Sequence, residues 1–129
     1  MIISKPPLRV SFLGGGTDIP EFYNKYPGQV ISSTIDKYVY VMVKERWEDK
    51  IRVSYTNNEE IDDLENLKNT RVKAVLEYFG IKKGIEIVSW ADLPAQIGLG
   101  GSSAFTVGLV NAIGKFQGNN FYPEKLTEI

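Results

Sequence analysis

A glycine-rich segment, residues 94–104, restricts the fold more than any other part of the sequence. It reads Pro-Ala-Gln-Ile-Gly-Leu-Gly-Gly-Ser-Ser-Ala and lies between a strand-like run at residues 85–88 and an amphipathic run at residues 102–116. This order predicts a strand, a loop and a helix. The first turn of a helix has unpartnered N–H groups and partial positive charge, and glycine lets that backbone approach an anion closely. The segment therefore predicts a phosphate-binding loop.

The residues of this predicted site are Pro94, Gly98, Leu99, Gly100, Gly101, Ser102, Ser103 and Ala104. We expect Ser102 and Ser103 to cap the helix and to offer hydroxyls to phosphate oxygens or to Mg²⁺. The segment is not a Walker A loop, because no Gly-Lys-Ser/Thr follows the glycines. It departs from the dinucleotide-binding fingerprint too, since Ser103 stands at the third glycine. A flexible loop with serine capping is the alternative interpretation, and an NAD-dependent oxidoreductase is a weaker one.

A second cluster of polar residues lies near the start of the chain. Alternation at residues 8–12 predicts a strand that carries Arg9, and three glycines at residues 14–16 end it. Asp18 then stands before Pro20, where a helix is predicted to begin. Asp18 has two interpretations: it caps this helix, or it accepts hydrogen bonds from substrate hydroxyls beside a bound phosphate. In the second, Arg9 neutralises phosphoryl charge.

The remaining pattern predicts mostly strands, with helices inserted singly. Asp36 and Lys37 mark a turn or bend between two of the strands. The predicted elements are strands at 29–35, 38–44 and 51–55, a polar loop at 56–63, a helix at 64–79, and a further helix that opens at 122–125. We therefore expect an α+β fold, with a mixed or antiparallel sheet and helices on one face.

Composition excludes several kinds of chemistry. The chain of 129 residues has no cysteine and no histidine, so disulfides, thiolate nucleophiles and the usual zinc ligands are ruled out. Proton transfer would rely on carboxylates, Lys, Tyr or a polarised hydroxyl. A net charge of −1 argues against nucleic acid as a partner. No apolar run is long enough for a membrane span or a signal peptide, so we expect a cytoplasmic protein without membrane contact.

Two segments resemble the GHMP kinase superfamily. Residues 94–104 are similar to its Pro-x-x-x-Gly-Leu-Gly-Ser-Ser-Ala nucleotide loop, with Gly101 where a serine is more usual. Residues 7–10 followed by 14–18 are similar to its substrate-side motif. The Gly-Gly-Gly-Thr-Asp version of that motif, together with Ile-Asp-Lys-Tyr at 35–38, most resembles the D-glycero-D-manno-heptose 7-phosphate kinases.

The resemblance implies a ribosomal protein S5 domain 2-like fold, ATP as phosphoryl donor, Mg²⁺ as cofactor, and a sugar or sugar phosphate as acceptor. Residues 98–103 would hold the triphosphate, and Ser103 or Ser102 would contact Mg²⁺. Asp18 would bind the acceptor hydroxyls, with Arg9 nearby. The acceptor site implied by the motif consists of Gly15, Gly16, Thr17 and Asp18.

One departure from the family pattern concerns the later catalytic carboxylates. After Ser103 the only acidic residues are Glu124 and Glu128, and neither matches a family motif. We therefore expect residues 1–129 to be the ATP-binding N-terminal domain of a sugar kinase, truncated and without its C-terminal domain. The alternative is a non-catalytic nucleotide-binding or regulatory remnant. A truncated chain would expose the surface that normally contacts the second domain, and this exposed surface would favour self-association.

Overall fold

The computed structural model describes residues 1–121 of the chain, and the helix opening expected at 122–125 lies outside them. The strands are β1 (Ile2–Ser4), β2 (Pro7–Leu13), β3 (Ile31–Glu45), β4 (Ile51–Ser54), β5 (Asn58–Ile61) and β6 (Ile85–Ala91). The α-helices are α1 (Pro20–Tyr23), α2 (Thr70–Tyr78) and α3 (Gly101–Phe116). Two short 3-10 helices, η1 (Gly15–Thr17) and η2 (Leu64–Asn66), complete the order.

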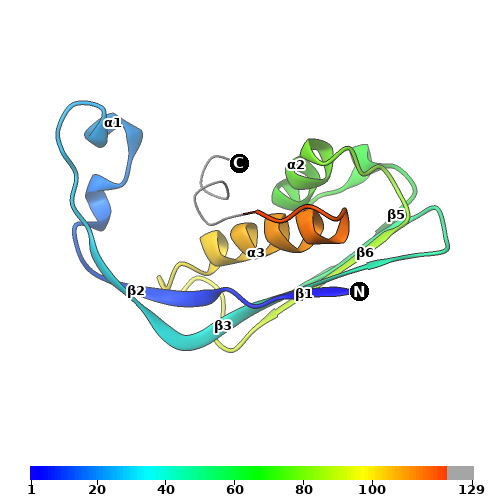
Figure 1. The fold of residues 1–129 in the computed structure, drawn as a ribbon, viewed down its shortest axis with the longest axis horizontal. Helices are drawn as coiled ribbons and strands as arrows, with labels where there is room; N and C mark the ends of the chain where they lie inside the picture. Colours follow the sequence, from blue (N-terminus) through cyan, green and yellow to red (C-terminus); the bar gives the residue numbers. More distant parts are fainter. Residues whose placement is uncertain (122–129) are drawn as a thin grey trace.

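The strands form one mixed sheet in the order β1-β3-β6-β4-β5, and β2 pairs with β3 (Figure 1). All pairs are antiparallel except β4 with β6, which runs parallel. The connection from β4 to β6 contains β5, η2 and α2, as a crossover between parallel strands requires. Helices α2 and α3 lie on one face of this sheet (Figure 1). The expected α+β class, with a mixed sheet and helices on one face, is confirmed.

Alternation along the strands explains the core. The inward positions of β3 are Val39, Val41 and Val43, all buried, and their neighbours Tyr40 and Met42 face the other side of the sheet. Buried apolar residues of β4, β6, α2 and α3 complete the same cluster. They include Ile51, Val53, Ile85, Ile87, Val72, Leu76, Leu109 and Ile113. The helices therefore cover the sheet through one continuous hydrophobic core.

The predicted pair of strands at 29–35 and 38–44 is a single long strand, β3. Asp36 and Lys37 do not end it, because neighbouring strands continue to pair on both sides of them: β2 before and β6 after. They do mark an irregularity, since the register to β2 shifts between Pro7 opposite Tyr38 and Arg9 opposite Thr34. The prediction of two strands with a turn or bend between them at residues 36–37 was therefore wrong, although the pairing with β2 is irregular there.

The structure differs from the prediction at three other places. Residues 58–61, expected to be loop, form edge strand β5, held to β4 by a regular antiparallel ladder. The helix expected at 64–79 begins only at Thr70, because Asn69 caps it by accepting from the Val72 amide. The short strand β1 was missed altogether.

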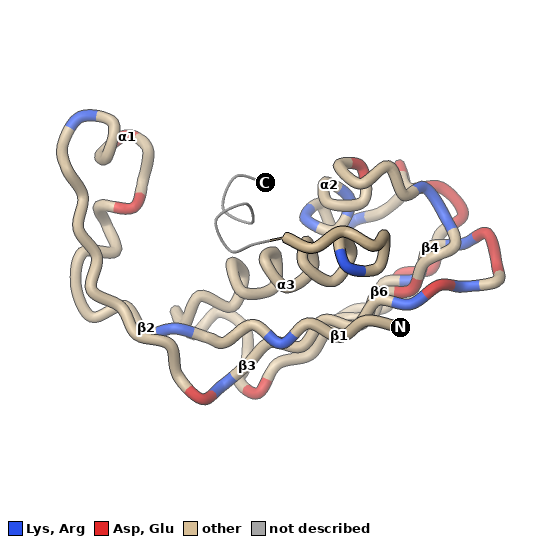
Figure 2. Tube along the Cα trace, viewed as in Figure 1, with Lys and Arg blue, Asp and Glu red and all other residues tan. Residues whose placement is uncertain are grey.

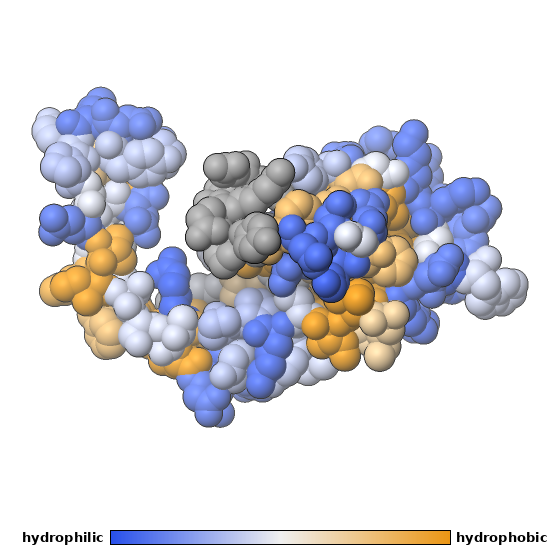
Figure 3. Space-filling model, viewed as in Figure 1, coloured by the Kyte–Doolittle hydropathy of each residue, from blue (hydrophilic) through white to orange (hydrophobic). Residues whose placement is uncertain are grey.

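The distal parts of β2 and β3, with η1 and α1, form an arm (residues 10–35) that projects beyond the rest of the molecule (Figure 1). None of residues 9–38 is buried. The arm exposes Phe12 by 62%, Leu13 by 67% and Ile31 by 60%, and an apolar patch covers its strands in Figure 3. The arm is therefore held by β-ladder hydrogen bonds and turn contacts rather than by a core of its own.

Charged residues are unevenly distributed. They are concentrated around β4, β5 and α2, whereas the arm carries only Asp18, Glu21 and Lys25 (Figure 2). Ion pairs such as Lys44 with Glu86 (2.9 Å) lie on the uncovered face of the sheet. Within the described residues, no helix combines the length and the apolar character needed to cross a bilayer.

Candidate functional site

The loop between β6 and α3 has a backbone that few sequences can adopt. Gln96, Gly98 and Gly100 all have positive φ angles, of 67°, 77° and 72°. For Gln96, which has a Cβ, this left-handed conformation is strained, and residues with such strain cluster at active sites and ligand-binding segments. A Cβ added at Gly98 would have no atom within 4 Å, so this stretch of backbone faces open space. The glycines therefore leave the loop open to the close approach of a ligand.

Helix α3 begins directly after this loop without a side-chain cap. Its N-cap is Gly100, and no side chain accepts a hydrogen bond there. The first helical bond within the chain is from the Ala104 amide to the Gly100 carbonyl, 2.9 Å. The amides of residues 101–103 therefore have no partner from the helix itself. The prediction that Ser102 and Ser103 cap the helix was wrong, because both lie inside its first turn.

A cavity of about 750 Å³ lies against this loop and the start of α3. It is bounded by β2, β3, the end of β6 and the segments around β4 and α2. Of the predicted phosphate-site residues, Pro94, Gly98, Leu99, Gly100, Gly101 and Ser102 line the cavity. Ser103 does not line it and is exposed, and Ala104 is buried in the core. The loop, its glycines and the helix start therefore share one concave surface.

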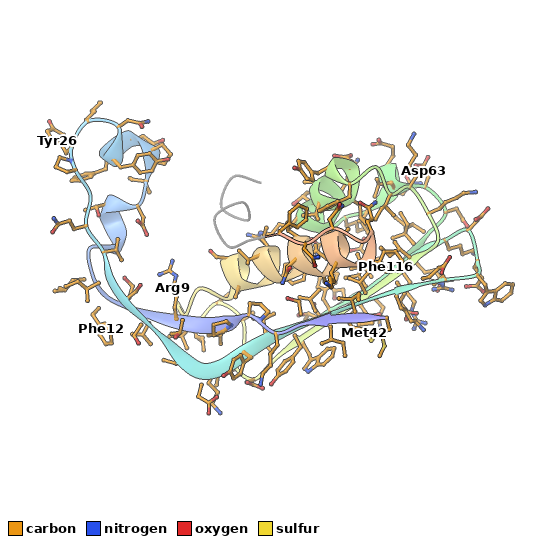
Figure 4. All side chains as sticks on the ribbon, viewed as in Figure 1. Arg9, Phe12, Tyr26, Met42, Asp63 and Phe116 are labelled. Atoms are coloured by element: carbon orange, nitrogen blue, oxygen red, sulfur yellow. The ribbon has the colours of Figure 1, made fainter. Side chains whose placement is uncertain are left out.

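Arg9 is attached to the same loop. Its backbone amide donates to the carbonyl of Leu99, 3.1 Å, and a Cβ added at Gly100 would lie 3.1 Å from Arg9 Cγ. The Arg9 side chain rises from β2 on the helix side of the sheet, whereas Phe12 lies on the opposite side (Figure 4). The structure thus brings the backbone and side chain of Arg9 against the glycine loop, although Arg9 does not itself line the cavity.

The other predicted acceptor residues lie in the arm. Gly15, Gly16 and Thr17 form η1, and Asp18 follows it, exposed. The Thr17 hydroxyl donates to the Gly14 carbonyl (2.7 Å) and lies 3.2 Å from that of Gln29, so it closes the tip of the arm. None of the four lines the cavity. The helix-cap interpretation of Asp18 was wrong, because α1 has Ile19 at its N-cap position and no side-chain cap.

Sequence reasoning missed the far wall of the cavity. Tyr55, Thr56, Asn69 and Arg71 line it, although they belong to segments read as strand end, loop and helix. The Tyr55 hydroxyl donates to Glu59, 2.8 Å, and this hydrogen bond raises the pKa of Tyr55 above its usual value. The phenol is therefore protonated at neutral pH. No local signal identifies these residues, because only the crossover from β4 to β6 brings them to the loop.

The fit to a metal ion differs from the fit to a phosphate. Among residues 1–121 no group of three or more Asp or Glu side chains lies together as a metal site. Mg²⁺ in phosphoryl-transfer sites is usually held by one or two carboxylates together with substrate phosphates. Around the cavity the described residues offer hydroxyls, such as that of Ser102, and free amides. They suit the phosphates and do not supply a carboxylate pair for the metal.

Known proteins share this architecture. Residues 66–129 match the profile described as "GHMP kinases N terminal domain". The chain is 30% identical over 127 residues to D-glycero-alpha-D-manno-heptose 7-phosphate kinase of Campylobacter jejuni, covering 89% of this chain and 38% of that kinase. It is 27% identical to 4-diphosphocytidyl-2-C-methyl-D-erythritol kinase of Bacillus subtilis, covering 99% of this chain and 44% of that protein.

A solved structure supports the same fold. The chain superposes with a TM-score of 0.87 on a D-glycero-D-manno-heptose 1-phosphate kinase from Bacteroides thetaiotaomicron, at 23% identity, covering 99% of this chain and 46% of that one. The chain thus spans less than half the length of each of these relatives. The profile match begins before α2 and includes the glycine loop and α3. By its sequence and its fold, the chain belongs to the GHMP kinase family, and its residues 66–129 match the N-terminal domain of that family.

Proposed function

We propose that the chain binds ATP at the cavity beside α3, as the nucleotide-binding part of a kinase that phosphorylates a sugar or a sugar phosphate. The observation that carries this proposal is the set of free amides at residues 101–103, next to a glycine loop with positive φ angles and a cavity of about 750 Å³. Free amides, partial positive charge and an accessible backbone together are what a polyphosphate needs.

The cavity has room for the rest of the nucleotide. Its volume lies within the range typical of ligand sites, and its walls combine apolar side chains with a few polar groups. With the phosphates over residues 98–103, the base would lie toward Tyr55, Asn69 and Arg71. Asn69 uses its side-chain oxygen to cap α2, which leaves its amide group to donate to a ligand.

The proposed chemistry is in-line phosphoryl transfer, which depends on positioning and charge stabilisation more than on covalent catalysis. Arg9, packed against Gly100, would neutralise charge on the transferred group. Asp18 would orient the acceptor hydroxyl, with Gly15, Gly16 and Thr17 around it. Mg²⁺, when bound, would supply charge neutralisation at the phosphates, and the hydroxyl of Ser103 or Ser102 would contact it; of the two, Ser102 lines the cavity.

For the acceptor we propose D-glycero-D-manno-heptose 7-phosphate or a related sugar. The support is the Gly-Gly-Gly-Thr-Asp motif at 14–18 and the similarity to the heptose 7-phosphate kinase of Campylobacter jejuni. The similarity to a 4-diphosphocytidyl-2-C-methyl-D-erythritol kinase spans at least as much of the chain. The choice of a heptose phosphate as acceptor therefore depends on the motif at 14–18. The proposed phosphoryl donor is ATP. We also propose a cytoplasmic location and a ribosomal protein S5 domain 2-like fold.

A second candidate function is a non-catalytic nucleotide-binding or regulatory module. One observation favours it: Asp18 lies in the arm and does not line the cavity, so the described residues alone do not assemble donor and acceptor groups in one place. The exposed apolar residues of the arm, Phe12, Leu13 and Ile31, support self-association as part of either proposal.

Titration calorimetry of the 129-residue chain with Mg²⁺ and a non-hydrolysable ATP analogue tests the proposal. We expect saturable binding of the analogue and none of NAD. ATP consumption with a panel of sugars, heptose 7-phosphate included, then separates the kinase from the regulatory module. Absence of analogue binding by the folded chain would contradict the nucleotide site, and binding of NAD alone would favour the oxidoreductase interpretation.

A further inference from the structure

Strand β6 ends next to the phosphate-binding loop in an unusual way. Its last residue, Ala91, lies opposite Val39 of β3, and Asp92 follows opposite Tyr38. The Asp92 amide donates to the Tyr38 carbonyl, 3.0 Å, as a continuing antiparallel ladder requires. The return bond differs, because the Tyr38 amide donates to the side-chain carboxylate of Asp92, Oδ2, at 2.9 Å. The carboxylate thus stands in for the backbone carbonyl of its own residue.

This substitution determines where the sheet ends. In a regular pair the two residues would exchange both backbone hydrogen bonds, and the chain would stay in the sheet through residue 92. Here the backbone carbonyl of Asp92 is released from the ladder, so the chain turns away at this residue. Leu93 and Pro94, the next two residues, already line the cavity.

The opposite end of the loop is held in a comparable way. The Leu99 carbonyl accepts from the Arg9 amide of β2, 3.1 Å, immediately before α3 begins. The loop is therefore attached at both ends to the pair formed by β2 and β3, once through a backbone bond and once through the Asp92 side chain. Between these anchors lie the strained Gln96 and the open glycine Gly98.

We propose that Asp92 is a positioning residue, which fixes the start of the phosphate-binding loop by accepting the hydrogen bond of the Tyr38 amide. It does not contact the cavity itself and acts through the backbone of residues 93–100. Without its carboxylate, the Tyr38 amide would recruit the carbonyl of residue 92, extend the ladder and draw the following residues toward the sheet. The ligand named for the loop rests on the proposed function, whereas the anchoring of the loop does not.

The test compares three variants of the 129-residue chain. Asp92→Ala removes the acceptor, and Asp92→Asn keeps an acceptor oxygen of the same reach without the charge. Asp62→Ala is the matched control, since among residues 1–121 this exposed carboxylate pairs only with Lys50, 3.5 Å away just before β4, and does not line the cavity. Two readouts are taken for each: amide hydrogen exchange of Tyr38 and residues 93–101, and calorimetry with Mg²⁺ and a non-hydrolysable ATP analogue.

We expect Asp92→Ala to speed amide hydrogen exchange at Tyr38 and across residues 93–101. It should also weaken the affinity for the ATP analogue by roughly fivefold to tenfold, the factor that one hydrogen bond represents. Asp92→Asn should restore both readouts to within about threefold of the parent, because the hydrogen bond is retained. The control variant should change neither. Rescue by asparagine separates loss of the acceptor from loss of the charge.

Each contrary result has a definite meaning. Unchanged exchange in Asp92→Ala overturns the anchor, and so does an asparagine variant as impaired as the alanine one. If Asp92→Ala does not fold, Asp92→Asn decides alone, and faster loop exchange in it overturns the proposal. If the parent chain binds no analogue while Asp92→Ala still alters loop exchange, the anchor stands and the proposed nucleotide function fails.

Discussion

The body of the molecule and its arm are built on the same strand and stabilised by different means. In the body, β3 contributes Val39, Val41 and Val43 to a continuous core beneath α2 and α3. In the arm, none of residues 9–38 is buried, although β3 and β2 remain paired. Hydrophobic burial stabilises the body, and hydrogen bonds with tight glycine turns hold the arm.

The difference teaches where function can be placed without loss of stability. The glycine loop at residues 93–100 lies at the boundary, because its anchors are on β2 and β3 and the helix that follows it is in the core. The proposed acceptor residues lie wholly in the arm. Substitutions in the body should therefore change folding, those at the boundary should change loop geometry, and those in the arm should change neither.

The largest expected effect is in the body. Ile87→Ala removes most of a fully buried side chain in the central strand β6, and should lower the free energy of unfolding by about 2–5 kcal/mol. Urea unfolding followed by circular dichroism measures it, and Ile87→Val, expected to cost about 0.5–1.5 kcal/mol, remains measurable if the alanine variant is unfolded. Phe12→Ala in the arm is the control. An equal loss in the control would remove the distinction between body and arm.

The next effect is at the boundary. Gly100→Ala places a Cβ at a residue with φ of 72°, against Arg9 Cγ, and should cost about 1–2 kcal/mol. It should also weaken the ATP analogue, measured by calorimetry. Gly80→Ala is a matched control, because φ is 67° there and a Cβ meets nothing within 4 Å. Both variants carry the same backbone strain, so equal nucleotide affinity in the two would dispose of a special role for Gly100.

A smaller and local effect is expected at the tip of the arm. Thr17→Val removes the hydroxyl that bonds to the carbonyls of Gly14 and Gln29. It should lower the free energy of local opening of the arm tip by about 0.5–1.5 kcal/mol. Amide hydrogen exchange at residues 14–30 reports this, while the urea midpoint of the body should not move. Ser33→Ala, which removes a hydroxyl bonded only to the adjacent residue, is the control. A lowered urea midpoint would mean that arm and body unfold together.

The smallest structural effect is expected at Asp18, which is exposed. Asp18→Ala should leave the urea midpoint and the affinity for the ATP analogue unchanged, and should weaken only the binding of the sugar acceptor. Calorimetry with heptose 7-phosphate, in the presence of the analogue, measures the latter, and Glu21→Ala in the adjacent helix is the control. An equal loss of affinity for the ATP analogue would show that the proposed role of Asp18 in acceptor binding is wrong.

Local chemistry made part of this molecule predictable from sequence. The glycine loop and α3 were recognised because glycines, serines and an amphipathic run follow one another directly. Edge strand β5 was not, since its polar residues at 58–60 carry no apolar alternation and pair only because β4 lies beside them. The continuity of β3 was hidden for the same reason: strands β2 and β6, distant in sequence, override the polar pair at 36–37.

The site shows the same division. Residues 98–102 were found from their own sequence, and the structure brings them to the cavity. Tyr55, Asn69 and Arg71 reach it only through the β4 to β6 crossover, which no short window of sequence contains. Asp92 carries no signal either, because its importance arises from the partner that β3 offers it.

The single strand β3 also joins a local pairing to a non-local one. Its pairing with β6 joins residues from 40 positions apart (Glu45 with Ile85) to 52 positions apart (Val39 with Ala91), whereas its pairing with β2 is more local. Residues 39–45 of this strand contribute to the core, whereas residues 31–34 pair with β2 alone, in a register that shifts between Pro7 and Arg9. Because the strand is continuous, its buried half fixes the point and the direction from which the arm leaves the body.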